Sequence, residues 1–382
     1  MEKEGQDTKV YFQNLDVLRF VAAFMIVITH WYGAMKGWFG LPKFMQGNFP
    51  FESNKVWSYF ERAIDNFGYG VDIFFLISGF LITYLLLKEK EKYGRISLKD
   101  FYIRRTLRIW PLYYFLVMLG PLLVSWTHST PKPNYLAQIF FVGNFDQIHT
   151  GQWIYPFSHF WSIHVEEHFY LIWPFLVAFI PNKRLPFVFS FVIFFSIVFR
   201  LFLYLNSDYS FYDFYLNTLS RLDVLAIGAL FAYRHHQKPW VVNIPGPIRI
   251  LIYTLLVMLF CTDTFYIYLS VTDVTFKKYF CLALVTMGIG SFLFGTNNKL
   301  APKKKNIFHY FGKVSYGMYM YNNILVNIVI LKIMYPINSS SPYLFTLIYF
   351  SLCLLVPVIS YEIMEKPFLK LKKRFEIIKT SR

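Results

Sequence analysis

Residues 15–34 read LDVLRFVAAFMIVITHWYGA, an apolar run interrupted by Asp16, Arg19 and His30. An α-helix rises about 1.5 Å per residue, so a run of roughly 20 residues spans the roughly 30 Å hydrocarbon core of a bilayer. No small-residue cleavage site follows this run, so we expect the helix to stay in the chain rather than act as a cleaved signal peptide. The run therefore predicts a transmembrane helix and places the chain among integral membrane proteins.

The composition of the whole chain supports this class. Of 382 residues, 56% are hydrophobic and only 16% are charged, whereas a soluble domain carries about 25% charged residues. Apolar runs of about 17–25 residues predict ten spans, at 15–34, 69–87, 109–127, 165–181, 186–205, 219–233, 247–268, 279–296, 314–334 and 343–364. We expect an all-α integral membrane fold of about ten transmembrane helices, in a single domain over residues 1–382.

Within that domain we expect a core at 15–367 and a basic cytoplasmic tail at 368–382. The long segments 35–68 and 128–164 are rich in aromatic residues, proline and glycine, and exceed ordinary connection lengths. They predict a partly ordered outer cap with a short helix around 134–142.

The distribution of charge predicts the orientation. The net charge is +16, and if the N-terminus is cytoplasmic, the loops on that side hold 26 of the 38 Lys and Arg residues against 8 in the outer loops. This bias is the positive-inside pattern of a multi-pass protein in the cytoplasmic (inner) membrane. Both termini are therefore expected in the cytoplasm, and no nucleic acid is needed to explain the charge. The three cysteines form no CxxC pair or Cys/His cluster, so we expect no metal site.

Two groups of basic residues occur inside or at the start of predicted spans. Arg19 and His30 are eleven residues apart, about three helical turns, and so share one face at a separation of roughly 16 Å. Arg105 and Arg108 stand one turn apart where a span begins at the cytoplasmic side. Paired guanidinium groups suit phosphate oxygens. The alternatives are that Arg19 snorkels, His30 packs at the interface, and the arginine pair is ordinary positive-inside anchoring.

Acidic residues and further histidines gather near the expected outer side. The stretch at 159–174, HFWSIHVEEHFYLIWP, contains His159, Trp161, Glu166 and Glu167. Carboxylates at a membrane boundary are costly, which indicates that one of them polarises a histidine or has a raised pKa. The alternative is a structural ion-pair network that includes Arg221. Asp72 and Asp223 belong to the same outer group, and Gly79 is a small residue that predicts close helix packing.

Sorted by depth, the polar residues give a cationic inner mouth and an outer pocket of histidines and carboxylates. The inner set contains Arg19, Arg105, Arg108, Ser315, Tyr316 and Glu365. The outer set contains His30, Asp72, His159, Glu166, Glu167, Arg221 and Asp223. This arrangement indicates that a group is transferred across the bilayer.

Seven motifs in order resemble those of the acyltransferase-3 membrane family, the bacterial O-acyltransferases of surface glycans. The resemblance runs from about Leu15 to Pro367. Its motifs are LDVLRFVAAFMIVITH, GVDIFFLISGFLIT, RRTLRIWPLYY, HFWSIHVEEHFYLIWP, SRLDVLAIGALFA, GKVSYGMYMY and YEIMEKP. One departure is Asn322, which stands where the family often has a histidine.

The resemblance implies a ten-helix fold, an acyl-CoA donor that is usually acetyl-CoA, and O-acylation of a carbohydrate. It implies His30 as the catalytic histidine, Arg19 as an essential arginine, and Arg105 with Arg108 as donor-binding residues. Some relatives carry an additional span and an extracytoplasmic domain that this sequence does not show, so we expect transfer to be completed in the membrane domain.

We expect acyl-CoA to bind as a co-substrate from the cytosol, with no permanently bound cofactor. Ser315 and Tyr316 would join the arginines at the donor site. His30 would act as general base on the acceptor hydroxyl, oriented by Glu166 or Glu167. The remaining outer residues would contact the acceptor or be structural; they are Asp72, His159, Trp161, Arg221 and Asp223. The expected partners are acyl-CoA, a carbohydrate or lipid-linked glycan, and the bilayer.

Two other hypotheses remain open on the sequence. A transporter or flippase for a lipid-linked sugar or acyl donor would use the same outer pocket but would not need the Arg105/Arg108 pair, and no inverted repeat is visible. A scaffold with a decayed active site is indicated only by Asn322, and the presence of His30 and both arginines argues against it.

Overall fold

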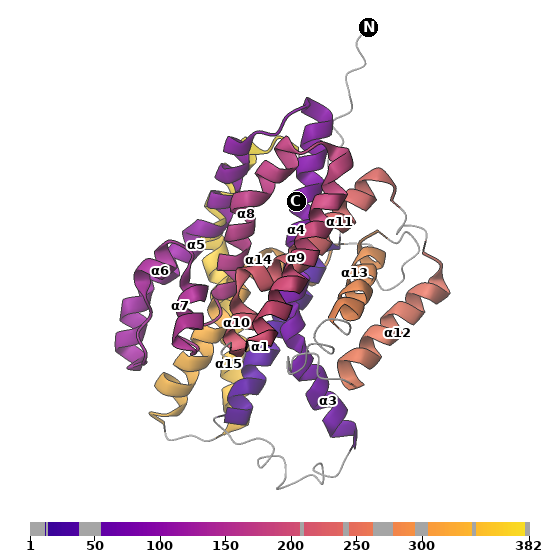
Figure 1. Cartoon of the computed structure of the whole chain (residues 1–382). Helices are drawn as coiled ribbons and strands as arrows, with labels where there is room; N and C mark the ends of the chain where they lie inside the picture. The colour runs from indigo at the N-terminus through magenta and orange to yellow at the C-terminus, as the bar shows by residue number, and fades with distance from the viewer. Residues whose placement is uncertain are drawn as a thin grey trace.

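The structure is a computed structural model that describes residues 12, 14–37, 55–206, 210–239, 244–262, 278–294, 305–337 and 341–378. These residues form a bundle of helices and contain no β strand (Figure 1). The predicted all-α class is therefore confirmed for the described part of the chain.

Four helices make the centre of the bundle: α1 (Leu15–Gly37), α4 (Gly70–Tyr93), α11 (Thr218–Gln237) and α14 (Ile307–Ile328). The contact between α4 and α11 depends on glycine, which confirms the close helix packing predicted at Gly79. A Cβ at Gly79 would lie 2.0 Å from the carbonyl oxygen of Leu225, and a Cβ at Gly228 would lie 2.3 Å from that of Leu76. Each helix therefore places a glycine against the backbone of the other, the small-residue packing typical of membrane helices.

Further helices surround this centre. They are α5 (Leu98–Thr127), α8 (Trp161–Phe179), α9 (Leu185–Leu205), α12 (Gly246–Thr262), α13 (Lys278–Phe294) and α15 (Pro342–Ser360). The outer face of α9 exposes Phe187, Phe191 and Phe194, with 76%, 56% and 60% of their surface accessible. These residues recur at helical spacing, so they form one stripe. Exposed phenylalanine at this density is suited to lipid and not to water.

Within the described part of the chain, seven helical segments are long and apolar enough to cross a membrane: Leu15–Gly37, Tyr59–Tyr93, Leu98–Thr127, Asn182–Leu205, Phe211–Gln237, Ile307–Met334 and Pro342–Phe375. Each of the ten predicted spans falls on a helix, but α8 carries Glu166 and Glu167, and α12 and α13 have only 17 residues each. The predicted ends of the last two, 263–268 and 295–296, lie outside the described residues. The count of ten and the orientation stay predictions.

The two ends of the bundle differ. At the end we call the basic end, α1 begins, α4 runs into α5, and α15 continues through η6 (Tyr361–Glu365) into α16 (Lys366–Lys372) and η7 (Lys373–Phe375). Here η2 (Asn182–Arg184) also joins α8 to α9. Arg104 binds the tail to α5, because it donates to the Phe375 carbonyl at 2.8 Å and pairs with Glu89 at 3.5 Å.

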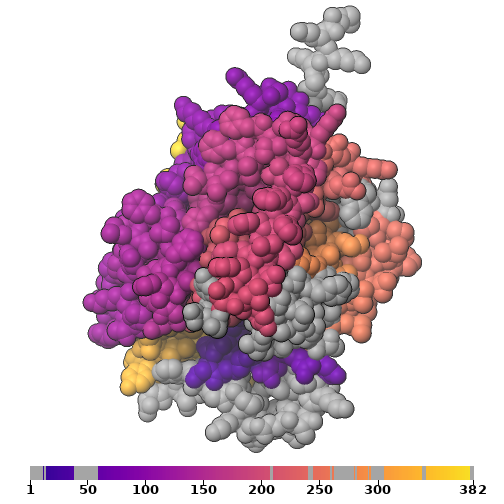
Figure 2. All heavy atoms as spheres, in the orientation of Figure 1, coloured from indigo at the N-terminus to yellow at the C-terminus, as the bar shows by residue number. Residues whose placement is uncertain are grey.

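The opposite end, which we call the capped end, carries the short helices. They are α3 (Lys55–Asp65), η1 (Asn66–Tyr69), α6 (Tyr135–Ile139), α7 (Gly143–Thr150) and α10 (Phe211–Leu216), with η5 (Val329–Met334) extending α14. Helix α6 confirms the short helix predicted around 134–142, and α3 and η1 are ordered parts of the other segment predicted to form the cap. The segment containing α6 and α7 projects from the side of the bundle (Figures 1 and 2).

Single cysteines should report which end faces the cytoplasm. Lys92 at the basic end and His149 at the capped end are both exposed. In a variant without native cysteines, we expect His149→Cys to react with a membrane-impermeant maleimide in intact cells, and Lys92→Cys to react only after permeabilisation. The physical reason is the concentration of Lys and Arg at the basic end. If only Lys92→Cys were labelled in intact cells, the basic end would face outward and the predicted orientation would be wrong.

Candidate active site

A cavity on the basic side of the bundle collects the arginines that the sequence singled out. It encloses about 730 Å³ of empty space between α1, α4, α5, α8 and α14. We call it the basic cavity. Its polar lining residues are Arg19, Ser78, Arg105, Arg108, Ser162, Glu166, Tyr170, Ser315, Tyr316 and Tyr319. Five residues predicted for the donor site therefore line one space.

The arginines of α5 face two different surroundings. Arg104 is held by Glu89 and the tail, as described above, while Arg105 and Arg108 share the face that lines the cavity. The Arg105 guanidinium lies 5.6 Å from the ring centroids of both Phe101 and Tyr170. Its Nε atom is buried and has no hydrogen-bond partner among the described residues. A buried guanidinium with an unused donor is suited to bind an anionic ligand.

Glu166 lies in the basic cavity, which differs from its expected place in the outer group. Tyr170 donates to Glu166 Oε2 at 2.9 Å, and the Tyr170 and Ser78 hydroxyls are 2.7 Å apart. The reason is that α8 begins at Trp161, before the predicted start at 165, so Glu166 enters the bundle one turn deeper. Glu167 lines neither this cavity nor the next one described, and its carboxylate interacts with Trp110. Glu365, expected in the inner set, is buried near Gly317 but does not line the cavity.

A second cavity lies towards the capped end and contains the two predicted histidines. It encloses about 1090 Å³, and we call it the histidine cavity. The rings of His30 and His159 are 6.4 Å apart, centroid to centroid. Nε2 of His159 lies 2.8 Å from the carbonyl oxygen of Met320. Because a carbonyl only accepts, this nitrogen carries the proton, and Nδ1 of His159 is buried without a hydrogen-bond partner among the described residues. Both rings therefore offer a nitrogen that can accept a proton.

Asn322, the residue that departs from the family pattern, lies beside His30. Its amide nitrogen donates to the carbonyls of Met318, at 3.2 Å, and Tyr319. These bonds fix the carboxamide, and its oxygen is buried without a partner among the described residues. His30 Nδ1 is also buried without a well-aligned partner, yet the imidazole interacts with the Asn322 side chain and the Ile26 carbonyl. Both neighbours of the ring offer oxygen acceptors.

The walls of the histidine cavity are aromatic and uncharged. The rings of Trp161 and Tyr215 pack at a tilt with 4.7 Å between centroids, and the Trp153 ring lies 5.3 Å from that of Tyr212. Other polar lining residues are Thr29, Tyr155, Ser158, Asn323 and Asn327. No Lys, Arg, Asp or Glu is among the described residues that line it. The two cavities thus differ sharply in charge.

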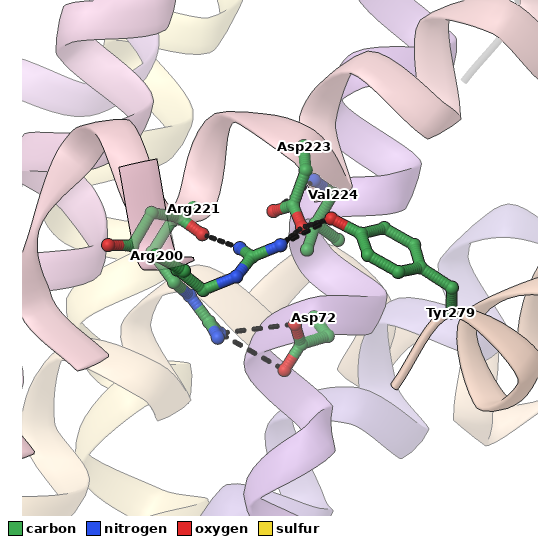
Figure 3. Close-up of polar contacts among 7 residues, drawn as sticks. Asp72, Arg200, Arg221, Asp223, Val224 and Tyr279 are labelled. Atoms are coloured by element: carbon green, nitrogen blue, oxygen red, sulfur yellow. Dashed lines mark hydrogen bonds and ion pairs between the residues drawn. The ribbon is translucent and has the colours of Figure 1, made fainter. Parts of the chain in front are cut away.

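Asp72, Arg221 and Asp223 line neither cavity and form buried ion pairs (Figure 3). Both oxygens of Asp72 accept from Arg221 Nη2 at 3.1 Å. Asp223 pairs with Arg200 at 2.9 Å and accepts from the Tyr279 hydroxyl at 2.6 Å. This geometry favours the structural alternative for these residues.

Nothing in the sequence indicated that Arg200 pairs with Asp223. The Arg221 guanidinium also lies over three rings, 5.7 Å from Phe75, 5.5 Å from Trp161 and 5.2 Å from Tyr215. Trp161 and Tyr215 are walls of the histidine cavity. Arg221, which is held by its ion pair with Asp72, therefore packs against the side of these two rings and fixes their positions.

Comparison with known proteins agrees with the motifs. A family model described as an acyltransferase domain matches residues 12–362. A "putative O-acetyltransferase" of Staphylococcus aureus (strain COL) is 28% identical over 79% of this chain and 52% of its own length. The peptidoglycan O-acetyltransferase OatA of Listeria monocytogenes serovar 1/2a is 36% identical over 31% of this chain and 21% of its own length.

The chain thus spans about half the length of the first of these relatives. No solved structure matches it. Because the family model covers the chain from the start of α1 into η6, the chain belongs to the acyltransferase-3 family.

Proposed function

We propose that the chain is a membrane O-acyltransferase that moves an acyl group, in the first place acetyl, from cytosolic acyl-CoA to a hydroxyl of a carbohydrate at the outer face. The observation that carries this proposal is the pair of adjoining cavities, one lined by three arginines and the other by His30. A phosphate-bearing donor fits the first cavity and an uncharged polyol fits the second.

The donor site follows from the chemistry of coenzyme A, which carries phosphates at one end and a thioester at the other. Arg105 and Arg108 would bind the phosphates, because a guanidinium forms forked hydrogen bonds to oxyanions. Arg19, Ser315 and Tyr316 line the same space and would contact the donor beyond its phosphates. The pantetheine arm would then extend towards the histidine cavity.

The chemical step requires a base at the acceptor hydroxyl. His30 would take the hydroxyl proton while the acceptor oxygen attacks the thioester carbonyl carbon. A C–O bond forms, the C–S bond breaks, and coenzyme A leaves as the thiolate, which then takes up the proton. The oxyanion of the tetrahedral intermediate needs a hydrogen-bond donor. Tyr155 lines the cavity, and its buried hydroxyl interacts with the Thr127 side chain; this hydroxyl would be the donor to the oxyanion.

We infer that Asn322 positions His30, in place of the expected Glu166 or Glu167. The fixed Asn322 oxygen and the unpartnered His30 Nδ1 complement each other if Nδ1 carries the proton. That tautomer leaves Nε2 free to act as the base. Glu166 lines the other cavity and Glu167 lines neither, whereas Asn322 interacts with the imidazole itself.

The acceptor class follows from the lining of the histidine cavity. Aromatic faces and neutral amide and hydroxyl groups suit the apolar faces and the hydroxyls of a sugar, and no charged side chain among the described lining residues would attract an ionic acceptor. The name of the Listeria relative, a peptidoglycan O-acetyltransferase, makes a cell-wall glycan the first acceptor to test.

The direct test is to supply purified protein in liposomes with radiolabelled acetyl-CoA and glycan fragments. We expect stoichiometric release of free coenzyme A thiol and label in the glycan. A transporter or flippase would move its cargo without thiol release. Absence of thiol release with every acyl-CoA and every glycan offered would overturn the proposed function.

Donor binding gives a second test. We expect Arg105→Ala and Arg108→Ala each to weaken acetyl-CoA binding by about tenfold or more, because hydrogen bonds to charged groups contribute roughly 1.5–3 kcal/mol each. Binding is measured by titration calorimetry on protein in nanodiscs. Raised salt should weaken binding to the unaltered protein as well.

Arg95→Ala is the matched control, because Arg95 is exposed at the same end of the bundle and lines neither cavity. The affinity of this variant for acetyl-CoA should stay within about twofold of that of the unaltered protein. An Arg105→Ala/Arg108→Ala double variant with unchanged affinity would remove the basic cavity as the phosphate site.

A further inference from the structure

The basic cavity and the histidine cavity share two lining residues, Val71 on α4 and Tyr319 on α14. Every other described lining residue belongs to one cavity alone. An acyl group held by a donor in the first cavity would therefore have to pass these two side chains to reach His30 in the second.

The Tyr319 side of this passage is fixed. Its hydroxyl donates to the His159 carbonyl at 2.6 Å and accepts from the Ser162 hydroxyl at 2.6 Å. The ring is also packed between Phe74 and His159, at 6.1 Å and 5.7 Å between centroids. Swinging the ring aside would leave two buried polar groups without partners, each at a cost of about 1–3 kcal/mol.

The Val71 side is fixed by its neighbour. Gly70 lies so close to α1 that a Cβ there would be 2.5 Å from the Ala22 carbonyl oxygen, so the start of α4 has no room to move towards α1. Val71 itself is only 5% exposed. Its β-branched side chain has one strongly preferred rotamer in a helix. Neither wall can therefore retreat cheaply, and the bulk of residue 71 sets the width of the passage.

We propose that Val71 and Tyr319 form a filter that selects acyl groups by cross-section. This inference rests on the proposed function. A linear acyl group is no wider than the pantetheine arm that carries it, so it passes. An α-branched acyl group, such as isobutyryl, has a second methyl beside the carbonyl and meets the Val71 side chain. The length of the acyl chain matters less, because the histidine cavity beyond is the larger of the two.

The test compares kcat/KM for acetyl-CoA and isobutyryl-CoA with the same glycan acceptor. The unaltered protein should strongly prefer acetyl. We expect Val71→Ala to raise the isobutyryl-to-acetyl ratio by on the order of tenfold, since the fit of one methyl in an apolar site changes kcat/KM by about 10–200-fold. Val71→Leu should lower acetyl transfer while acetyl-CoA affinity, set by the arginines, stays within about threefold.

Ile77→Ala is the control, because Ile77 lines only the basic cavity. It enlarges the donor space without widening the passage, so it should leave the ratio unchanged. If Val71→Ala transfers acetyl normally and its isobutyryl-to-acetyl ratio of kcat/KM stays unchanged, the filter proposal is wrong while the proposed function stands. An equal rise in Ile77→Ala would place selection in the donor cavity instead. If the unaltered protein transfers no acyl group at all, the proposed function fails and the filter with it.

Discussion

Replacing His30 with alanine should reduce acyl transfer by about 10²–10⁴-fold, the usual contribution of a general base, while acetyl-CoA binding stays within about twofold. The two properties separate because His30 lines the histidine cavity and the arginines line the basic cavity. His30→Gln should be equally inactive, since glutamine keeps hydrogen-bonding ability but does not accept a proton at neutral pH. Transfer of label from acetyl-CoA to glycan measures the first property, and calorimetry measures the second.

His149→Gln is the control for this substitution, because His149 is exposed at the capped end and lines neither cavity. It should be fully active. A His30→Gln variant with activity within a few-fold of the original would show that His30 is structural. In that case an inactive His159→Gln would move the base to His159, whose ring lies 6.4 Å away.

The second large effect concerns stability and the ion pairs behind the site. We expect Arg221→Met to cost about 3–5 kcal/mol, because it leaves the Asp72 carboxylate buried and uncompensated. Both side chains are almost fully buried, at 1% and 2% exposed. The melting temperature of the protein in detergent, followed by fluorescence-detected size exclusion, should fall by roughly 5 °C.

Two further variants make this result interpretable. An Asp72→Asn/Arg221→Met double variant has no uncompensated charge at this pair and should recover part of the loss. Lys88→Met breaks an exposed pair with Glu91, for which less than about 1 kcal/mol is expected. An Arg221→Met variant that melts normally but binds no glycan would show that Arg221 contacts the acceptor directly.

Part of the lining of the basic cavity could be predicted from the sequence because it depends on local spacing. Arg105 and Arg108 are one turn apart, so any helix over this segment presents them together. Arg19, on the first span, could be placed near them by its depth alone. The prediction for Glu166 was wrong in depth because the start of α8 was placed at 165 and not at Trp161. Four residues of helix correspond to about 6 Å along the axis, enough to move a side chain from one cavity to the other.

Contacts between distant helices could not be predicted in this way. Asn322 stood out in the sequence, but its place beside His30 depends on how α14 packs against α1. The same holds for Arg200, which pairs with Asp223 from another helix. Val71 and Tyr319 lie within two of the quoted motifs, but their position at both cavities depends on how α4 and α14 pack.

The reciprocal glycines of α4 and α11 also bear on the mechanics of crossing the bilayer. Carriers that open alternately to the two sides need an interface along which one half rocks or slides over the other. Here Gly79 and Gly228 each receive the backbone of the opposite helix, so a shift by even one residue would drive a side chain into main-chain atoms. The two helices therefore cannot slide along each other and form one rigid unit. Under the proposed function, this helix pair would stay fixed while the flexible arm of the donor reaches into the bundle.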